Sequence, residues 1–216
     1  MKKKRDAHDE LMLVLAELHG VLKSFEPTLL VQGVVSPVGA TSEGTLIEAV
    51  SPVWKMLVSH LRTDPYLAFQ IAPRKWEELV AAAFDEAGYD EVVLTPRSGD
   101  LGRDVIAVKR GIGAVKILGS VKAYKPGHLV RHDDVRALMG VLAADVSASK
   151  GIVTTTSNFA PGIMTDPLIK SLIPYRLELL NGSQLQEWFE QIVRQSTTEP
   201  PNPVTQRTPE LARRRR

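Results

Sequence analysis

A helical apolar stripe followed directly by three short strand-like segments constrains the fold of this chain more than any other feature. Apolar side chains recur at helical spacing between residues 75 and 87, and Gly88 is a residue type that commonly ends a helix. The stripe consists of Trp76, Leu79, Val80, Ala83, Phe84 and Ala87. Residues 91 to 96, 103 to 109 and 114 to 123 then favour the strands of an antiparallel meander. A helix face that must cover such a sheet predicts an α/β fold.

The segments after the meander extend this unit into a layered domain. A helix from about residue 133 to 145 leads to a buried strand at residues 151 to 156. A further strand at residues 174 to 180 and a helix from Ser183 close the unit. The order αβββαβ, followed by one more βα unit, predicts an α/β sandwich with a mixed sheet over residues 72 to 194.

Residues 1 to 71 are expected to form a small helical segment that serves packing or dimerisation. Residues 8 to 25 carry leucines at helical spacing, whereas residues 27 to 45 are rich in Pro, Gly, Ser and Thr and favour a loop. Ser51-Pro52 predicts the start of a helix, with the serine as its cap, that continues to about Arg62.

Residues 195 to 216 are expected to be a disordered basic tail. The sequence there turns to Ser, Thr, Pro and Glu and ends in four arginines. Weak attraction to phosphate groups is a possible use of this segment.

Two oppositely charged residues stand near the ends of neighbouring predicted strands. Side chains alternate along a strand, so Asp104 shares a face with Ile106, and Lys122 shares a face with Leu118 on the next strand. A carboxylate and an ammonium that meet at one end of a sheet can hydrolyse a phosphodiester, the first by holding Mg²⁺ and the second by orienting water. A surface ion pair is the commoner reason for such a spacing.

Glu77 lies at the margin of the helical stripe, beside Phe84. From that position it can reach the sheet edge that carries Asp104. The alternative is a solvated carboxylate on the flank of the helix.

Five short motifs, taken in order, resemble the Mrr-type restriction endonuclease domain. They are RKWEELV (residues 74 to 80), AGY (87 to 89), SGDLGRDVI (98 to 106), VKAY (121 to 124) and KGIVTTTSNFA (150 to 160). The resemblance covers about residues 72 to 193 and implies the PD-(D/E)xK nuclease fold with Mg²⁺-dependent cleavage of double-stranded DNA, in which Mn²⁺ can substitute. It also implies that Glu77 is the helix carboxylate, Asp104 the principal metal ligand and Lys122 the catalytic lysine.

One position departs from the pattern of that family. Ser120 stands two residues before the lysine, where the family usually has Gln or Glu. A serine hydroxyl can place a water or a phosphate oxygen, but it does not supply the charge of a carboxylate. The metal shell can be completed by another acidic residue, and the candidates are Glu77, Asp100, Asp133 and Asp134. Asp133 and Asp134 have the simpler interpretation of helix-start residues, because carboxylates favour the positive end of a helix.

Basic residues cluster in and just after the predicted catalytic hairpin, although the net charge of the chain is only +2. A DNA backbone would have to lie at this place, and an ordinary solvated basic face is the alternative. The candidate DNA contacts are Tyr124, Lys125, His128, Arg131 and His132.

Composition excludes several classes of protein. The chain has no cysteine, so it has no disulfide and no zinc thiolate site. No apolar run approaches the ~20 residues of a membrane span, and the basic start is followed by acidic residues rather than by the core of a signal peptide. A cytoplasmic protein without a membrane partner is the expectation.

These patterns together predict an Mrr-like, Mg²⁺-dependent DNA endonuclease that acts in defence against foreign DNA. Cutting both strands usually requires two active sites, so a homodimer is expected. Two alternatives remain open: a DNA-binding or assembly module that lost its chemistry at Ser120, and a structure-selective DNA resolvase on the same fold.

Overall fold

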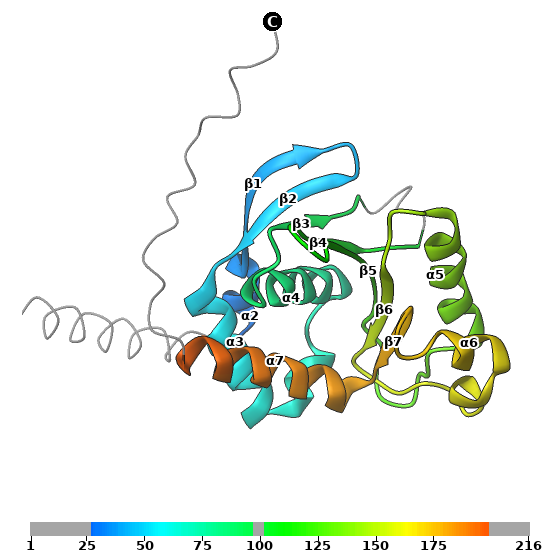
Figure 1. Cartoon of the computed structure of the whole chain (residues 1–216). Helices are drawn as coiled ribbons and strands as arrows, with labels where there is room; N and C mark the ends of the chain where they lie inside the picture. Colours follow the sequence, from blue (N-terminus) through cyan, green and yellow to red (C-terminus); the bar gives the residue numbers. More distant parts are fainter. Residues whose placement is uncertain (1–26, 97–101, 199–216) are drawn as a thin grey trace, which may run out of the picture.

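The computed structural model describes residues 27–96 and 102–198 (Figure 1). Three expectations concern residues outside these ranges: the leucine stripe of residues 8 to 25, the participation of Asp100, and the tail from residue 199 onwards.

A seven-stranded mixed sheet in sequence order forms the centre of the domain. Neighbouring strands from β1 to β5 are antiparallel, whereas β5, β6 and β7 run parallel. The strands are β1 (Val35–Thr41), β2 (Gly44–Ala49), β3 (Glu91–Leu94), β4 (Val105–Lys109), β5 (Val115–Lys122), β6 (Lys150–Thr155) and β7 (Leu177–Leu180). The predicted meander is therefore confirmed as β3, β4 and β5.

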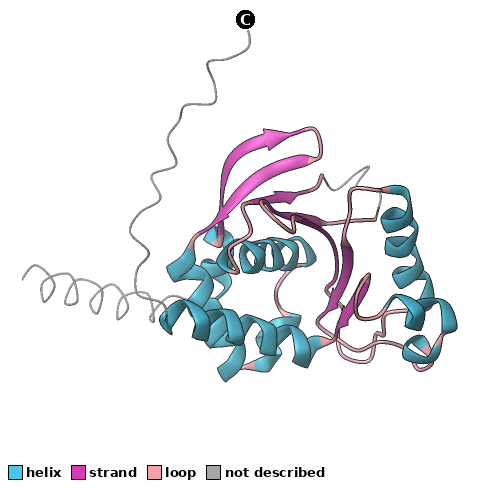
Figure 2. Ribbon diagram, in the orientation of Figure 1, coloured by secondary structure: helices cyan, strands magenta, loops and turns pink. Residues whose placement is uncertain are grey.

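Helices cover both faces of this sheet, as Figures 1 and 2 show. α3, α4 and α7 lie on one side, and α5 and α6 lie on the other. The helices are α2 (Pro27–Leu30), α3 (Ser51–Thr63), α4 (Pro73–Glu86), α5 (His132–Ala144), α6 (Pro167–Leu172) and α7 (Gly182–Thr198). The order from α4 to β6 is αβββαβ, so the predicted α/β sandwich with a mixed sheet is confirmed.

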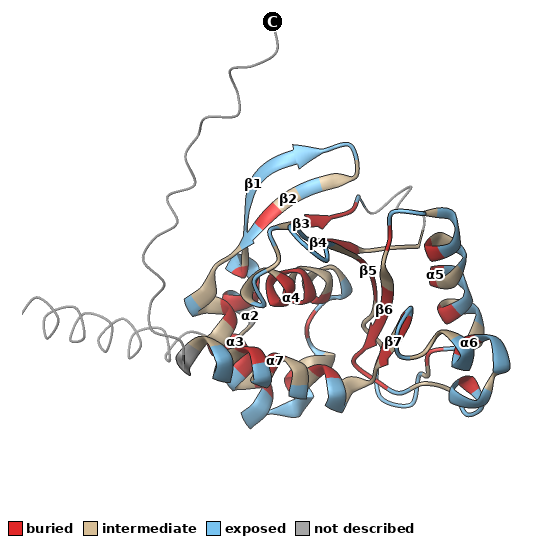
Figure 3. Ribbon diagram, in the orientation of Figure 1, coloured by how far each residue is buried: buried red, intermediate tan, exposed pale blue. Residues whose placement is uncertain are grey.

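Two separate hydrophobic clusters hold the layers together, one on each face of the sheet (Figure 3). Consecutive residues of β5 belong to different clusters: Ile117 packs toward α4, and Leu118 packs toward α5. The cluster on the α4 face contains Trp54, Leu79, Phe84, Val105 and Phe189, and that on the α5 face contains Ile106, Val135, Leu138, Val153 and Leu177. The apolar stripe predicted for residues 75 to 87 faces the sheet from Trp76 to Phe84, with Trp76, Leu79, Val80, Ala83 and Phe84 all buried. Its last predicted member, Ala87, is the C-cap of α4 and is exposed, because the helix has already ended at Glu86.

The predicted loop over residues 27 to 45 is wrong, because β1 and the start of β2 lie within it. β1 is an edge strand whose residues after Val35 are all exposed, so it lacks the buried alternation that identifies a strand from sequence. Pro37 is tolerated there, and the register shifts between Pro37 and Gly39. β2 pairs with β3, which makes this hairpin part of the same sheet.

Gly44 shows why the hairpin needs a glycine at its turn. Its φ is +149°, and a Cβ atom at this position would lie 2.1 Å from the carbonyl oxygen of Leu94. No side chain fits at this distance, so the close approach of β2 to β3 depends on glycine.

The ends of the helices follow the sequence signals in part. α4 stops before Gly88, which has a φ of 81°, as predicted. The N-cap of α3 is Val50 and Ser51 is already helical, so the prediction of Ser51 as the cap is wrong. α7 continues to Thr198, past the expected boundary at residue 194.

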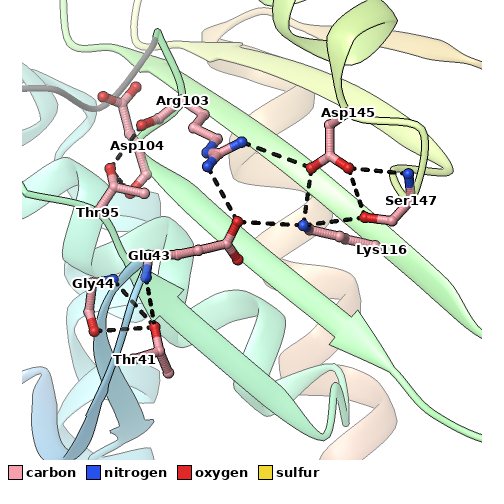
Figure 4. A network of polar contacts seen from close by, with 9 residues as sticks. All are labelled: Thr41, Glu43, Gly44, Thr95, Arg103, Asp104, Lys116, Asp145 and Ser147. Atoms are coloured by element: carbon pink, nitrogen blue, oxygen red, sulfur yellow. Dashed lines mark hydrogen bonds and ion pairs between the residues drawn. The ribbon is translucent and has the colours of Figure 1, made fainter.

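A network of charged side chains ties the β1–β2 turn to the body of the domain (Figure 4). Glu43 in this turn pairs with Arg103 at 3.1 Å and with Lys116 at 3.4 Å. Asp145 at the end of α5 pairs with the same two cations, at 3.7 Å from Arg103 and 2.9 Å from Lys116. Ser147 donates to Asp145 from its hydroxyl at 2.6 Å and from its backbone N–H at 3.0 Å. These donors, led by the Ser147 hydroxyl, lower the pKa of Asp145 to about 2.

Asp145→Asn is expected to destabilise the fold at neutral pH by about 1.5–3 kcal/mol, the range for hydrogen bonds to a charged group. The pKa of Asp145 is lowered from 3.8 to about 2 on folding. Its stabilisation is therefore complete above about pH 5 and is lost as the pH falls toward about 2. Urea unfolding at pH 7, 5, 3 and 2 measures this difference. Asp133→Asn is the control, since the Asp133 side chain is 95% exposed. A difference between wild type and Asp145→Asn that does not change with pH would contradict the assignment.

Candidate active site

Asp104 is fixed at the start of β4, next to the end of β5. Val105 pairs with Gly119, so Asp104 lies opposite Ser120 across the two antiparallel strands. The backbone N–H of Asp104 donates to the carbonyl of Gly119 at 2.7 Å. Its carboxylate oxygen Oδ2 accepts a hydrogen bond from the backbone N–H of Val121 at 2.6 Å. The backbone of β5 thus orients the carboxylate.

Ser120 and Lys122 follow Leu118 along β5 and share its face, the one covered by α5. Ser120 is buried, at 2% exposure, whereas the Lys122 side chain is 27% exposed. Lys122 is the last residue of β5 and pairs with Thr155 of β6, whose hydroxyl donates to the Lys122 carbonyl at 2.7 Å. The structure therefore brings Asp104, Ser120 and Lys122 to one end of two adjacent strands, as the alternation predicts.

Glu77 approaches this end of the sheet from α4, on the opposite face. It forms an ion pair with Arg74, and Arg74 donates to the carbonyl of Thr95 at 3.0 Å. The backbone N–H of Thr95 in turn donates to the carbonyl of Asp104 at 3.1 Å. The Glu77 side chain is only 17% exposed, so it is not a fully solvated carboxylate. Arg74 was not among the predicted site residues, although its spacing of three residues from Glu77 on one helix was the available signal.

Asp134, in the first turn of α5, contacts the side chains of Lys122 and Tyr124. Its Oδ1 lies 3.9 Å from Nζ of Lys122 and accepts a hydrogen bond from the Tyr124 hydroxyl at 3.3 Å. Its Oδ2 accepts from the backbone N–H of Arg131 at 2.9 Å, which caps the helix. The helix-start interpretation of Asp134 is confirmed, but the contact with Lys122 was not anticipated, because sequence spacing does not reveal where α5 crosses the sheet.

The pKa of the Tyr124 hydroxyl depends on how close Asp134 lies to it. Partial burial raises the pKa of Tyr124, and the negative charge of Asp134 raises this pKa further. Asp134→Asn is therefore expected to lower the pKa of Tyr124, while burial keeps it above 10.0. Titration of the tyrosine ring signals by NMR measures the shift. An unchanged pKa would place Asp134 away from Tyr124 in solution.

Three of the other candidate DNA contacts lie in the connection between β5 and α5, and the fourth, His132, is the first residue of α5. Lys125, His128 and Arg131 are exposed, and His132 is partly buried. The rings of Tyr124 and His128 meet edge to face, with centroids 4.3 Å apart. The His132 ring lies beside Gly162, where a Cβ atom would be 3.8 Å away. The connection starts directly after Lys122, so its exposed cations adjoin the predicted catalytic end of β5.

The donor set at this place fits a hard divalent cation. Among the residues described by the structure, no three His, Cys, Asp or Glu side chains form a metal-binding group. Mg²⁺ does not need such a cage, because it usually binds one or two carboxylates together with waters and substrate phosphates. Asp104 provides an oriented carboxylate, and Ser120 provides a neutral oxygen on the opposite strand. Oxygen donors of this kind suit Mg²⁺ or Mn²⁺ better than softer metals.

A carboxylate at the start of one strand and a lysine at the end of its antiparallel neighbour, within this helix-covered mixed sheet, define a restriction-endonuclease-like fold. The family model Mrr_cat, described as restriction endonuclease, matches residues 69–189. The chain belongs to this family of restriction endonucleases, which confirms the resemblance drawn from the motifs.

Two solved structures show similarity at low identity. One is titled "MspJI Restriction Endonuclease in Complex with 27-mer Oligonucleotide", with 19% identity, a TM-score of 0.37, and coverage of 68% of this chain and 35% of that one. The other is the "DNA modification-dependent restriction endonuclease AspBHI", with 16% identity, a TM-score of 0.38, and coverage of 66% and 39%. This chain thus corresponds to little more than a third of each of those proteins. No curated protein matches the chain.

The helices within residues 27–96 and 102–198 include none that is long and apolar enough to cross a membrane.

Proposed function

We propose that this chain is a Mg²⁺-dependent DNA endonuclease of the Mrr type that acts in defence against foreign DNA. One observation carries the proposal: the backbone of β5 orients the Asp104 carboxylate, and the same strand ends in Lys122. Both residues fall within the part of the chain that matches the restriction endonuclease family.

Each site residue has a proposed role in phosphodiester hydrolysis. Asp104 is the principal ligand of the cation, which when bound neutralises charge on the scissile phosphate. Lys122 orients the attacking water and stabilises the negative charge that develops on the phosphate. Glu77 supports the site from α4 through Arg74 and Thr95. Ser120 places a water or a phosphate oxygen beside Asp104.

The proposed substrate is double-stranded DNA, held by the connection between β5 and α5. The exposed side chains of Lys125, His128 and Arg131 can contact backbone phosphates there, with Tyr124 and His132 at the base of the connection. A homodimer would supply two such sites for cleavage of both strands. Mn²⁺ is expected to replace Mg²⁺, because both cations prefer oxygen ligands.

A second candidate function is a DNA-binding module that has lost cleavage. The observation that favours it is Ser120, a neutral residue at 2% exposure at the position where the family pattern has a carboxylate or an amide. Lys122→Ala distinguishes the two functions. In an enzyme the substitution removes the catalytic lysine and abolishes most of the cleavage, whereas in a binding module it removes only one of several cations that contact DNA.

The experiment measures nicking of plain and methylated plasmid in Mg²⁺, Mn²⁺ or EDTA, together with gel shifts in EDTA. The enzyme proposal expects metal-dependent cleavage that falls by about 10²–10⁴-fold in Lys122→Ala, the range for a positioned proton-transfer group. DNA binding should persist in the variant. Binding without cleavage of either plasmid in either metal would favour the binding module.

A further inference from the structure

Position 120 carries a serine rather than an acidic residue, but the neighbouring helix α5 places a carboxylate, that of Asp134, close to the same end of β5. Ser120 and Lys122 share the face of β5 that α5 covers, and α5 presents Asp134 to that face in its first turn. The Asp134 carboxylate lies 3.9 Å from the ammonium of Lys122, and its side chain is 24% exposed. A carboxylate thus stands beside the predicted catalytic lysine, although β5 itself provides none on this face.

Two hydrogen bonds hold Asp134 in this position. The Arg131 backbone N–H donates to Oδ2 at 2.9 Å, and the Tyr124 hydroxyl donates to Oδ1 at 3.3 Å. With one donor on each oxygen, rotation of the carboxylate away from Lys122 would break both bonds. Side chains held by such partners are suited to orienting a reactive group.

Asp133 provides an internal comparison one residue earlier. It occupies the same first turn of α5 and has the same charge, so it interacts with the helix dipole in the same way. Its side chain is 95% exposed, and its ion-pair partner is Arg136, at 4.0 Å. The structure therefore places Asp133 in solvent and Asp134 against Lys122.

We propose that Asp134 is the second carboxylate of the active site, which orients Lys122 and supplies the negative charge that Ser120 does not. This inference rests on the proposed nuclease function. Of the four acidic residues considered from the sequence, Asp134 is the one that compensates for the missing charge at position 120. It is a positioning residue, because it acts by orienting Lys122 and by adding negative charge near the cation site.

The test compares Asp134→Asn, Asp134→Glu and Asp133→Asn with the wild type in two measurements. The first is Mn²⁺ affinity, determined by calorimetric titration of the protein without DNA. The second is the rate of plasmid cleavage at saturating Mg²⁺. Asparagine keeps an oxygen for the Arg131 N–H and so preserves the helix cap, and thermal melts establish that each variant folds.

We expect Asp134→Asn to weaken Mn²⁺ binding and slow cleavage by about 10–100-fold, the usual effect of removing a partner from around a metal site. Asp134→Glu should recover part of both losses because it restores the charge, and Asp133→Asn should behave as wild type. Equal behaviour of Asp134→Asn and Asp133→Asn in both measurements overturns the inference and leaves the nuclease function intact.

The two proposals fail in different ways. Mn²⁺ binding that depends on Asp134 in a chain that cleaves no DNA would support this site and refute the nuclease function. A wild-type chain that neither binds Mn²⁺ nor cleaves DNA would refute both.

Discussion

Asp104→Asn is expected to reduce DNA cleavage by at least about 10²–10³-fold, the loss that follows removal of one oriented electrostatic group from an active site. The substitution removes the negative charge that would hold the cation. It keeps an oxygen that can accept the hydrogen bond from the Val121 N–H, now 2.6 Å from Oδ2 of Asp104. The fold should therefore remain intact. Single-turnover cleavage of a plasmid in Mg²⁺, with DNA binding measured in parallel, checks the result.

The control for this variant is Asp133→Asn, which also removes one negative charge but from a side chain that is 95% exposed. Its cleavage rate should equal that of wild type. Loss of cleavage in Asp104→Asn together with loss of the folded state would show that Asp104 acts as a structural residue. Retained cleavage would exclude it as the principal ligand.

Trp54→Ala is expected to destabilise the fold by about 3–5 kcal/mol, the range for truncating a buried aromatic side chain. Trp54 is fully buried, its indole N–H donates to the carbonyl of Leu79 at 3.1 Å, and its ring packs edge to face on Phe189, with centroids 5.5 Å apart. It therefore joins α3 to both α4 and α7. Urea unfolding at pH 7 measures the loss, and Tyr175→Ala, at an 87% exposed position, should change stability by less than about 0.5 kcal/mol.

This prediction concerns the boundary of the domain as well as its core. Trp54 precedes residues 69–189, the part that matches the family. The contacts of Trp54 with α4 and α7 indicate that α3 belongs to the same folding unit as these two helices. The domain boundary predicted at residue 71 would separate α3 from them, and the stability of this variant tests that boundary. A loss below 1 kcal/mol would show that the segment before residue 69 contributes little to the stability of the core.

The spacing of apolar residues predicted the central helix and strands of the fold, because this spacing reflects which face of each element is buried. The stripe from Trp76 to Phe84, the stop at Gly88 and the alternation in β4 and β5 each arise where one face of an element is covered. β1 has no covered face beyond Val35, so its composition resembled that of a loop. Edge strands of this kind are defined by backbone pairing with a neighbour, and sequence patterns do not record such pairing.

The part of the site that lies on the two neighbouring strands β4 and β5 was predicted from the sequence. Alternation placed Asp104, Ser120 and Lys122 at one end of β4 and β5, where the structure has them. The contact of Asp134 with Lys122 depends on how α5 crosses the sheet. The contact of Glu43 with Arg103 depends on the unpredicted hairpin. Contacts between distant elements follow from tertiary packing, which periodicity in one segment cannot reveal.

Cleavage of supercoiled plasmid by the wild-type chain and by Asp104→Asn, each in Mg²⁺ and in EDTA, decides whether Asp104 holds a catalytic cation. We expect nicked or linear product in Mg²⁺ for the wild type alone, and none in EDTA for either protein. Equal cleavage by the two proteins, or cleavage by the wild type that persists in EDTA, would contradict a metal-dependent nuclease centred on Asp104.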